Sequence, residues 1–151
     1  MESGRKIHVL FVCIGNSCRS PMAEAIARQD FPELWEVASG GLTPLGYIAP
    51  LSIETIERNG YCANGLSSKP IMHAHCQEID LVINMSGYSK NRALEKFKKV
   101  EDWDVGDPFG GDPEVYQQIF EEIWIRITRL AERLRRLNTA EFFGSNSRRT
   151  Q

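Results

Sequence analysis

The sequence predicts an α/β fold, with a single parallel sheet of about four strands and helices on both faces. Two observations lead to this prediction. Short apolar runs rich in β-branched residues alternate along the chain with segments of helical pattern, and strands that alternate with helices favour a parallel sheet. The chain of 151 residues also suits one domain. We expect this domain to cover residues 6–138 and the termini at 1–5 and 139–151 to be flexible.

The first half of the chain supplies two strands and the loop between them. Ile7–Val12 is an apolar, β-branched run and is predicted as a strand buried on both faces. The polar stretch 13–20 follows as a loop. Pro21 then opens a helix that runs to about Asp30, because proline at the first helical position favours a helix start. Glu36–Ser39 is predicted as the second strand, ended by Gly40–Gly41.

The second half adds two further strands and the longest helix. Pro50–Asn59 has an apolar face and is predicted as a helix, and Ile79–Asn84 is predicted as another buried strand. A short helix is expected over Ser89–Phe97 and an edge strand over Lys99–Trp103. The last helix shows apolar residues at steps of three and four, namely Val115, Ile119, Ile123, Ile127, Leu130, Leu134 and Leu137.

Composition and charge exclude several classes of function. The chain is 42% hydrophobic and 25% charged with a net charge of -2, so no overall field attracts it to nucleic acid or a membrane. Basic residues gather late, at Arg133, Arg135, Arg136, Arg148 and Arg149. We interpret them as a solvated helix face and tail. Without a membrane-length apolar run, a secretory leader or a disulfide framework among its four cysteines, the chain is expected in the cytoplasm.

The loop between the first strand and the first helix carries the chemistry. Residues 13–20 read Cys-Ile-Gly-Asn-Ser-Cys-Arg-Ser. A tight loop that leads into a helix directs several backbone N–H groups at one point, which suits a phosphate or another tetrahedral oxyanion. Gly15 can adopt the positive φ that we expect in this loop, and Asn16 is the next most tolerant residue type. Arg19 can bind two oxygens of such an anion. Its positive charge and the helix dipole both favour the thiolate form of Cys13.

The loop also carries a family resemblance. Cys-x5-Arg-Ser behind a strand, within the fuller string Cys-Ile-Gly-Asn-Ser-Cys-Arg-Ser-Pro-Met-Ala-Glu-Ala from Cys13 to Ala25, resembles the low-molecular-weight protein tyrosine phosphatases and their arsenate reductase relatives. The resemblance covers about residues 6–138. It implies the fold of that family, with Cys13 as the nucleophile and Arg19 as the group that holds the phosphoryl oxygens in the transition state.

The same resemblance assigns roles to the rest of the loop. Phosphate binding and loop support fall to Ile14, Gly15, Asn16, Ser17, Cys18 and Ser20, with Ser39 outside the loop. Ser20 would donate to the Cys13 sulfur, and Asn16 would brace the loop by a hydrogen bond to Ser39. Two simpler interpretations remain open, since Ser20 could cap the following helix and Ser39 could be an ordinary strand-end hydroxyl. The resemblance also implies that Cys13 and Cys18 can form a disulfide.

A phosphate ester needs a general acid for its leaving oxygen. In the family that this chain resembles, the acid is an aspartate followed by proline, shortly before the last helix. Asp107–Pro108 and Asp112–Pro113 both have this form. Asp112 directly precedes the helical run and is explained as its N-cap, with Pro113 at the first helical position. Asp107 is therefore predicted as the acid, and its alternative is an ordinary Asp-Pro turn.

The expected substrate is a phosphate monoester, phosphotyrosine in proteins or a small aryl phosphate. By resemblance, Tyr47 and Phe109 wall the cleft around the substrate ring, although Tyr47 could equally be a packed loop aromatic. The reaction would pass through a cysteinyl phosphate and needs no cofactor. His73, His75 and Cys76 lie close in sequence, but we interpret them as a solvated helix end, and no metal site is predicted.

Two other functions stay open. An arsenate reductase of the same fold would share the nucleophile, but the thioredoxin-linked enzymes need two relay cysteines after the third strand. Ser86 and Ala93 stand at about those places, which leaves a reductase that uses a low-molecular-weight thiol. A catalytically inactive phosphotyrosine-binding module is the alternative from another class, and the presence of Cys13, Arg19 and Asp107 together argues against it.

Overall fold

Residues 5–71 and 78–137 are described by the computed structural model of the chain. The termini that we expect to be flexible lie outside this part, apart from Arg5, and so do His73, His75 and Cys76. No helix in the described part is both long and apolar enough to cross a membrane.

The sheet confirms the predicted fold class. It has four parallel strands, β1 (Ile7–Cys13), β2 (Trp35–Gly41), β3 (Leu81–Asn84) and β4 (Val100–Asp102), in the order β2-β1-β3-β4. The second strand is longer than predicted, because Gly40 and Gly41 continue it instead of ending it. Both glycines pair with the end of β1, where Gly41 lies opposite Cys13.

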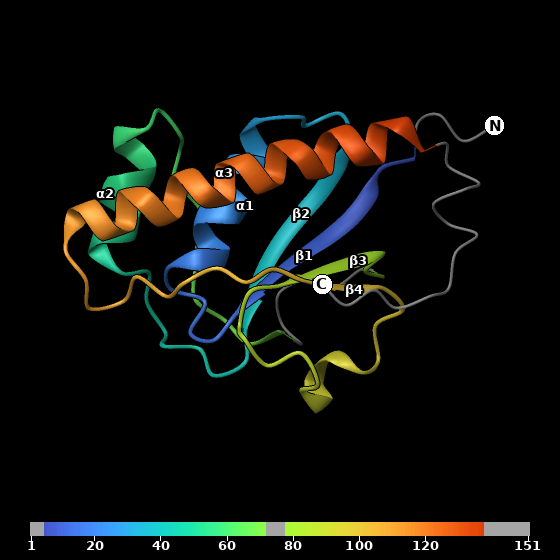
Figure 1. Cartoon of the computed structure of the whole chain (residues 1–151), viewed down its shortest axis with the longest axis horizontal. Helices are drawn as coiled ribbons and strands as arrows, with labels where there is room; N and C mark the ends of the chain where they lie inside the picture. The colour runs from blue at the N-terminus through green and yellow to red at the C-terminus, as the bar shows by residue number, and fades with distance from the viewer. Residues whose placement is uncertain (1–4, 72–77, 138–151) are drawn as a thin grey trace.

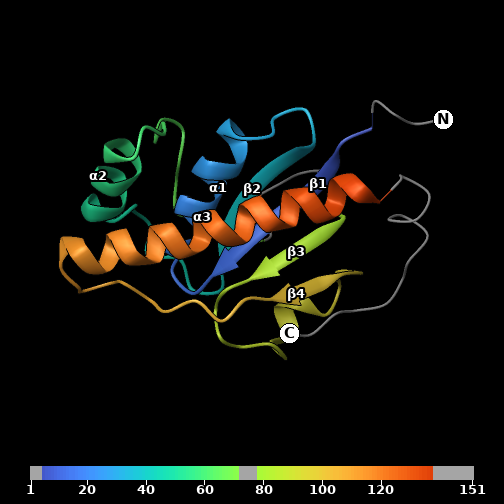
Figure 2. The same ribbon diagram turned by 45° about the horizontal axis from the view of Figure 1, so that its top comes forward.

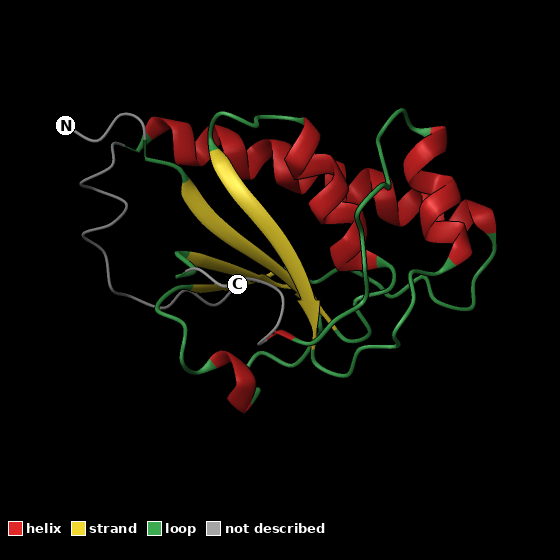
Figure 3. Ribbon diagram, turned by 180° about the vertical axis from the view of Figure 1, so that it is seen from behind, coloured by secondary structure: helices red, strands yellow, loops and turns green. Residues whose placement is uncertain are grey.

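The two faces of the sheet are covered differently. Helices α1 (Arg19–Gln29) and α3 (Pro113–Arg136) pack against each other on one face, and α2 (Pro50–Arg58) packs against both (Figures 1 and 2). Where a short helix was predicted over Ser89–Phe97, the described chain forms one 3-10 turn, η2 (Arg92–Leu94). This turn and the loops around it lie on the side of the sheet opposite α1 and α3 (Figure 3).

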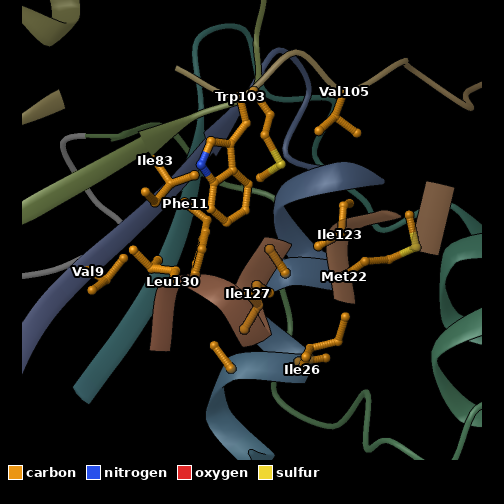
Figure 4. Close-up of a cluster of buried hydrophobic side chains, with 14 of the residues drawn as sticks. Val9, Phe11, Met22, Ile26, Ile83, Trp103, Val105, Ile123, Ile127 and Leu130 are labelled. Atoms are coloured by element: carbon orange, nitrogen blue, oxygen red, sulfur yellow. The ribbon is translucent and has the colours of Figure 1, made fainter. Parts of the chain in front are cut away.

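Side-chain alternation along β1 divides the core into two clusters. Val9 and Phe11 face the helices and are fully buried in the larger cluster (Figure 4). Leu10 and Val12 face the other side and pack with Leu94 of η2. Successive strand residues point to opposite faces, so a strand that is apolar at nearly every position must be covered on both.

The order of the strands places β1 at a switch point. From β1 the chain crosses first to β2 on one side and later to β3 on the other. In open parallel sheets, such a point leaves a crevice beyond the carboxyl ends of the strands. Cys13 is the last residue of β1, so the predicted loop lies at that crevice.

Candidate active site

Cys13 lies at the base of the loop, with its sulfur directed at the start of α1. The helix begins at Arg19, two residues earlier than predicted, and Cys18 is its N-cap without a side-chain capping bond. Ser20 therefore lies inside the first turn and does not cap the helix. Its hydroxyl lies 2.9 Å from Cys13 Sγ, and its backbone N–H donates to the same sulfur over 3.4 Å.

Asn16, rather than Gly15, adopts the positive φ in this loop. Asn16 has φ 49°, whereas Gly15 is not in the left-handed region. Hydrogen bonds of the Asn16 side chain stabilise this strained backbone conformation. Its Nδ2 donates to Ser20 Oγ over 2.8 Å and to Ser39 Oγ over 3.0 Å. Its Oδ1 accepts from the backbone N–H of Lys69 over 2.9 Å. A glycine here would hold none of these partners.

Gly41, beside the loop, is required for space, and Gly15, within it, is closely packed. A Cβ on Gly41 would lie 2.8 Å from the carbonyl oxygen of Ile14 and 3.0 Å from Cβ of Asn16. A Cβ on Gly15 would lie 3.1 Å from Cγ of Leu45. The loop therefore passes directly over the end of β2. Sequence reasoning missed this role of Gly41, since only its position opposite Cys13 in the sheet reveals it.

The middle of the loop is tied to the two neighbouring helices. The backbone N–H of Ala49, just before α2, donates to Ser17 Oγ over 2.9 Å, and Ser52 Oγ donates to the Ser17 carbonyl over 2.9 Å. Cys18 Sγ lies 3.5 Å from the hydroxyl of Tyr116 on α3. Burial raises the pKa of the Cys18 thiol, so this cysteine stays protonated at neutral pH.

Arg19 is buried and held at one edge of its guanidinium. Its Nη1 donates to the carbonyl oxygens of Met85, over 2.5 Å, and Val105, over 2.9 Å. Its Nη2 lies 3.5 Å from Oδ2 of Asp107. Its Nε is buried and has no hydrogen-bond partner among the described residues. One edge of the fork is therefore fixed to the protein, and the edge formed by Nε and Nη2 remains for a ligand with two oxygens.

The two aspartate-proline pairs have different structural surroundings. Asp112 caps α3, because its Oδ1 accepts from the N–H of Val115 over 3.1 Å. Asp107 is half-exposed and reaches the loop through Arg19. The turn proposed as the alternative for Asp107 is also present, since its Oδ1 accepts from the N–H of Phe109 over 3.1 Å. This turn holds the carboxyl in place without using its second oxygen.

A pocket of about 260 Å³ brings these residues together. Its lining consists of Cys13, Ile14, Gly15, Ser17, Cys18, Arg19, Thr43, Leu45, Asp107 and Phe109. Tyr47 is not among them and is 51% exposed. Its loop meets the pocket through Thr43 and Leu45, which sequence reasoning missed. Asn16, Ser20 and Ser39 lie behind the lining, fully buried.

Fold and loop together define a class of small α/β proteins with a Cys-x5-Arg loop between the first strand and the first helix. The chain belongs to the low molecular weight phosphotyrosine protein phosphatase family, whose model matches residues 8–140. This match covers most of the chain and confirms the resemblance seen in the loop.

Relatives of similar identity differ in their activities. A protein-arginine-phosphatase of Bacillus subtilis is 31% identical, over 85% of this chain and 97% of its own. A glutaredoxin arsenate reductase of Synechocystis is 32% identical, over 83% of this chain and 97% of its own. A solved arsenate reductase in its phosphate-binding state has a TM-score of 0.75 at 32% identity, over 85% of this chain and 98% of that one.

Proposed function

We propose that the protein hydrolyses aryl phosphate monoesters, including phosphotyrosine in proteins, through an S-phosphate of Cys13. The observation that carries this proposal is the edge of Arg19 formed by Nε and Nη2, beside the Cys13 loop. Its buried Nε, which has no partner among residues 5–71 and 78–137, and its Nη2 form a fork suited to two equatorial phosphoryl oxygens. The pocket that contains this edge also contains a thiol and a carboxyl. A related arsenate reductase is described in a phosphate-binding state, which supports an oxyanion in the loop.

The geometry supports a reaction in two steps. In the first, the Cys13 thiolate attacks phosphorus, the bond from phosphorus to the phenol oxygen breaks, and Asp107 gives that oxygen its proton. In the second, water loses a proton to Asp107 and attacks phosphorus, so that the sulfur–phosphorus bond breaks and inorganic phosphate leaves. Arg19 and the loop N–H groups stabilise the negative charge in both steps.

The walls of the pocket favour an aromatic leaving group. Ile14, Leu45 and Phe109 present apolar surface beside the loop, which suits a phenyl ring. Asp107 is the carboxylate among the described lining residues, and it already pairs with Arg19. A cationic guanidino leaving group would need a further acidic partner. We therefore favour phosphotyrosine over the phosphoarginine substrate implied by the name of the Bacillus subtilis relative.

Arsenate reduction is the second candidate, because relatives of equal identity are named arsenate reductases. That reaction needs another thiol to attack the adduct on Cys13. Ser86, near one expected relay position, has a hydroxyl bonded to Asn84 Oδ1 over 2.7 Å. Cys62 is exposed and outside the pocket lining, and Cys76 lies outside the described residues. Cys18 lines the pocket, but its attack on the adduct would leave a disulfide with Cys13 that an external thiol must reduce. A reductase would therefore depend on an external thiol.

One paired assay tests the proposal. The full chain is given an aryl phosphate, and phenol release is measured. Separately it is given arsenate and NADPH with either thioredoxin and thioredoxin reductase or glutathione, glutaredoxin and glutathione reductase, and NADPH consumption is measured. We expect steady phenol release and negligible NADPH consumption. Robust NADPH consumption with feeble ester hydrolysis would mean that the protein is an arsenate reductase and not a phosphatase. Tight binding of the ester without either reaction would mean that the protein is an inactive phosphotyrosine-binding module.

A further inference from the structure

A groove outside the Cys13 pocket lies between the second half of α3 and β4 (Figure 2). Its volume is about 600 Å³, which is within the size range of ligand sites. Four arginines of α3 line it, namely Arg126, Arg129, Arg133 and Arg136. None of the described residues that line this groove also lines the Cys13 pocket, so the two are separate sites.

The spacing of these arginines places them in one row along the helix. They follow one another at steps of three, four and three residues, and residues at such steps share a face of a helix. Arg136 follows Arg126 by ten residues, which corresponds to about 15 Å along the helix axis. The late basic residues of the sequence predict a solvated helix face, whereas Arg133 and Arg136 in fact border a groove.

Two of the four arginines are held by internal contacts. Arg133 Nη2 lies 2.5 Å from Oε1 of the buried Glu101, whose other oxygen accepts from Trp103 Nε1 over 3.0 Å. Arg126 pairs with Glu122 over 3.3 Å and lies over the ring of Trp103, 5.7 Å from the ring centroid. These contacts fix the shape of the groove and neutralise the charges of Arg126 and Arg133.

The other two arginines are available to a ligand. The side chains of Arg129 and Arg136 are exposed, and neither has an ion pair or a hydrogen bond with residues 5–71 and 78–137. Glu132 lies between them in the sequence and also lines the groove, but it pairs with neither. Ile125 and Leu130 add apolar surface. Within the described part of the chain, the lining thus offers two free cations and one free anion beside apolar side chains.

We propose that this groove binds an acidic segment of a partner protein, whose carboxylates pair with Arg129 and Arg136. Charge complementarity favours this occupant, and so does length. An extended chain rises about 3.3 Å per residue, so a segment of about five residues matches the row of arginines. Neutral side chains of the same segment can pack on the apolar part of the lining. The proposal goes beyond the proposed function, because binding here needs no residue of the Cys13 pocket.

Other polyanions fit the groove less well. Glu101, Glu122 and Glu132 lie among the arginines, and these carboxyls would repel a nucleic acid strand, which carries a charge at every phosphate. A membrane surface attracts clusters of lysine and arginine, but its headgroups cannot enter a hollow that is bordered by three glutamates. A peptide can instead place its carboxylates at the two free arginines and its neutral residues beside the glutamates.

The test measures binding to the full chain by fluorescence anisotropy. The probe is a fluorescein-labelled nonapeptide in which glutamate alternates with alanine, and the control probe has glutamine in place of every glutamate. We expect saturable binding of the acidic probe and much weaker binding of the control probe. The affinity for the acidic probe should fall as the salt concentration rises, because exposed charges are screened by salt.

Three substitutions in the groove should change this affinity in opposite directions. Arg129→Gln and Arg136→Gln should each weaken binding by about 3-fold and together by about 10-fold, the scale of exposed ion pairs. Glu132→Gln removes the free anion beside them and should strengthen binding by about 2-fold to 5-fold. A weakening by Glu132→Gln would contradict the proposal, since this carboxyl would then belong to the contact.

Arg135→Gln is the matched control for Arg136→Gln. It removes the same charge from the neighbouring position, but Arg135 pairs with Glu33 and is not part of the groove lining. Its affinity for the acidic probe should equal that of the wild type. Hydrolysis of a small aryl phosphate should be the same in all these variants, because none of them changes the lining of the Cys13 pocket.

Three further results would overturn the proposal. The first is the absence of saturable binding of the acidic probe. The second is an equal weakening by Arg135→Gln and Arg136→Gln, which would mean a general attraction to a basic helix. The third is a different occupant: a single-stranded oligonucleotide or phosphatidylserine vesicles that bind more tightly than the peptide, or a dimer that Arg136→Gln dissociates. Anisotropy needs no phosphatase activity, so a failure of the proposed function would leave this result unaffected.

Discussion

The Nη2 atom of Arg19 lies 3.5 Å from Oδ2 of Asp107. This contact joins the residue proposed to hold the phosphoryl group to the residue proposed to protonate the leaving oxygen. A phosphoryl oxygen that bonds to Nη2 competes with the carboxylate for the same donor. The carboxyl of Asp107 is then released from Arg19 and can act on the leaving oxygen. Substrate binding would therefore prepare the acid for its task.

Asp107→Asn tests that task. The amide preserves the turn to Phe109 but has no proton to give. We expect the turnover of an alkyl or poorly activated aryl phosphate to fall by about 10²–10⁴-fold. The loss should shrink for esters whose leaving group departs as a stable anion. Steady-state rates across a series of phenols of rising acidity measure both effects.

Asp112→Asn is the matched control for this substitution. Asparagine caps a helix as well as aspartate does, so activity should stay near that of the wild type and the melting temperature should change little. If Asp112→Asn proves the inactive variant while Asp107→Asn turns over normally, the two carboxyls have been assigned the wrong way round.

Gly41→Ala should disturb the loop without changing any group that reacts. The new Cβ would lie 2.8 Å from the Ile14 carbonyl oxygen, and backbone cannot yield as a flexible side chain does. We expect a stability loss of about 1–3 kcal/mol from overpacking. Turnover should fall on the order of 10-fold or more through displacement of the loop. Thermal unfolding and steady-state kinetics measure the two losses, and full activity in this variant would show that the loop tolerates the displacement.

Cys18 is expected to protect the site against oxidation. Peroxide attacks the thiolate of Cys13 first, because burial raises the pKa of Cys18 and keeps it protonated. A sulfenic acid on Cys13 can then be trapped by Cys18 as a disulfide. Dithiothreitol should therefore restore activity after peroxide treatment of the wild type but restore little in Cys18→Ser. Mass spectrometry that links Cys13 to Cys62 or Cys76 instead would contradict the pairing.

Tyr61 should contribute to stability only below strongly alkaline pH. Burial, with a hydrogen bond to Asp30, raises the pKa of Tyr61 from 10.0 to about 12. Between these values the unfolded chain loses the phenol proton and the folded chain keeps it. The contribution is therefore full below pH 10.0 and is lost as the pH rises through about 12. Chemical unfolding should show a smaller alkaline loss of stability in Tyr61→Phe, and equal losses in both proteins would contradict this.

The sequence predicts those features that depend on local pattern. The strand before Cys13, the cap at Asp112 and the long apolar repeat of α3 each occupy neighbouring positions in the chain, and each has the expected structure. The parallel sheet follows from the alternation of elements.

What the sequence does not predict depends on contacts between distant segments. Asn16 takes the positive φ instead of Gly15 because Ser39 and Lys69 provide partners for its side chain. Leu45 reaches the pocket and Tyr47 does not, which depends on the path of a loop with no regular pattern. The arginines of α3 look like an ordinary solvated helix face until β4 is placed beside them.

Acid quench during turnover tests the central claim most directly. The full chain is mixed with an aryl phosphate, stopped in acid within the first turnovers, and mapped for phosphate by mass spectrometry. The expected result is phosphate on the sulfur of Cys13 in the wild type, with neither phosphate at this position nor ester hydrolysis in Cys13→Ser, which should keep its fold. Phosphate on a different residue would contradict the account, and so would ester hydrolysis by Cys13→Ser at the wild-type rate.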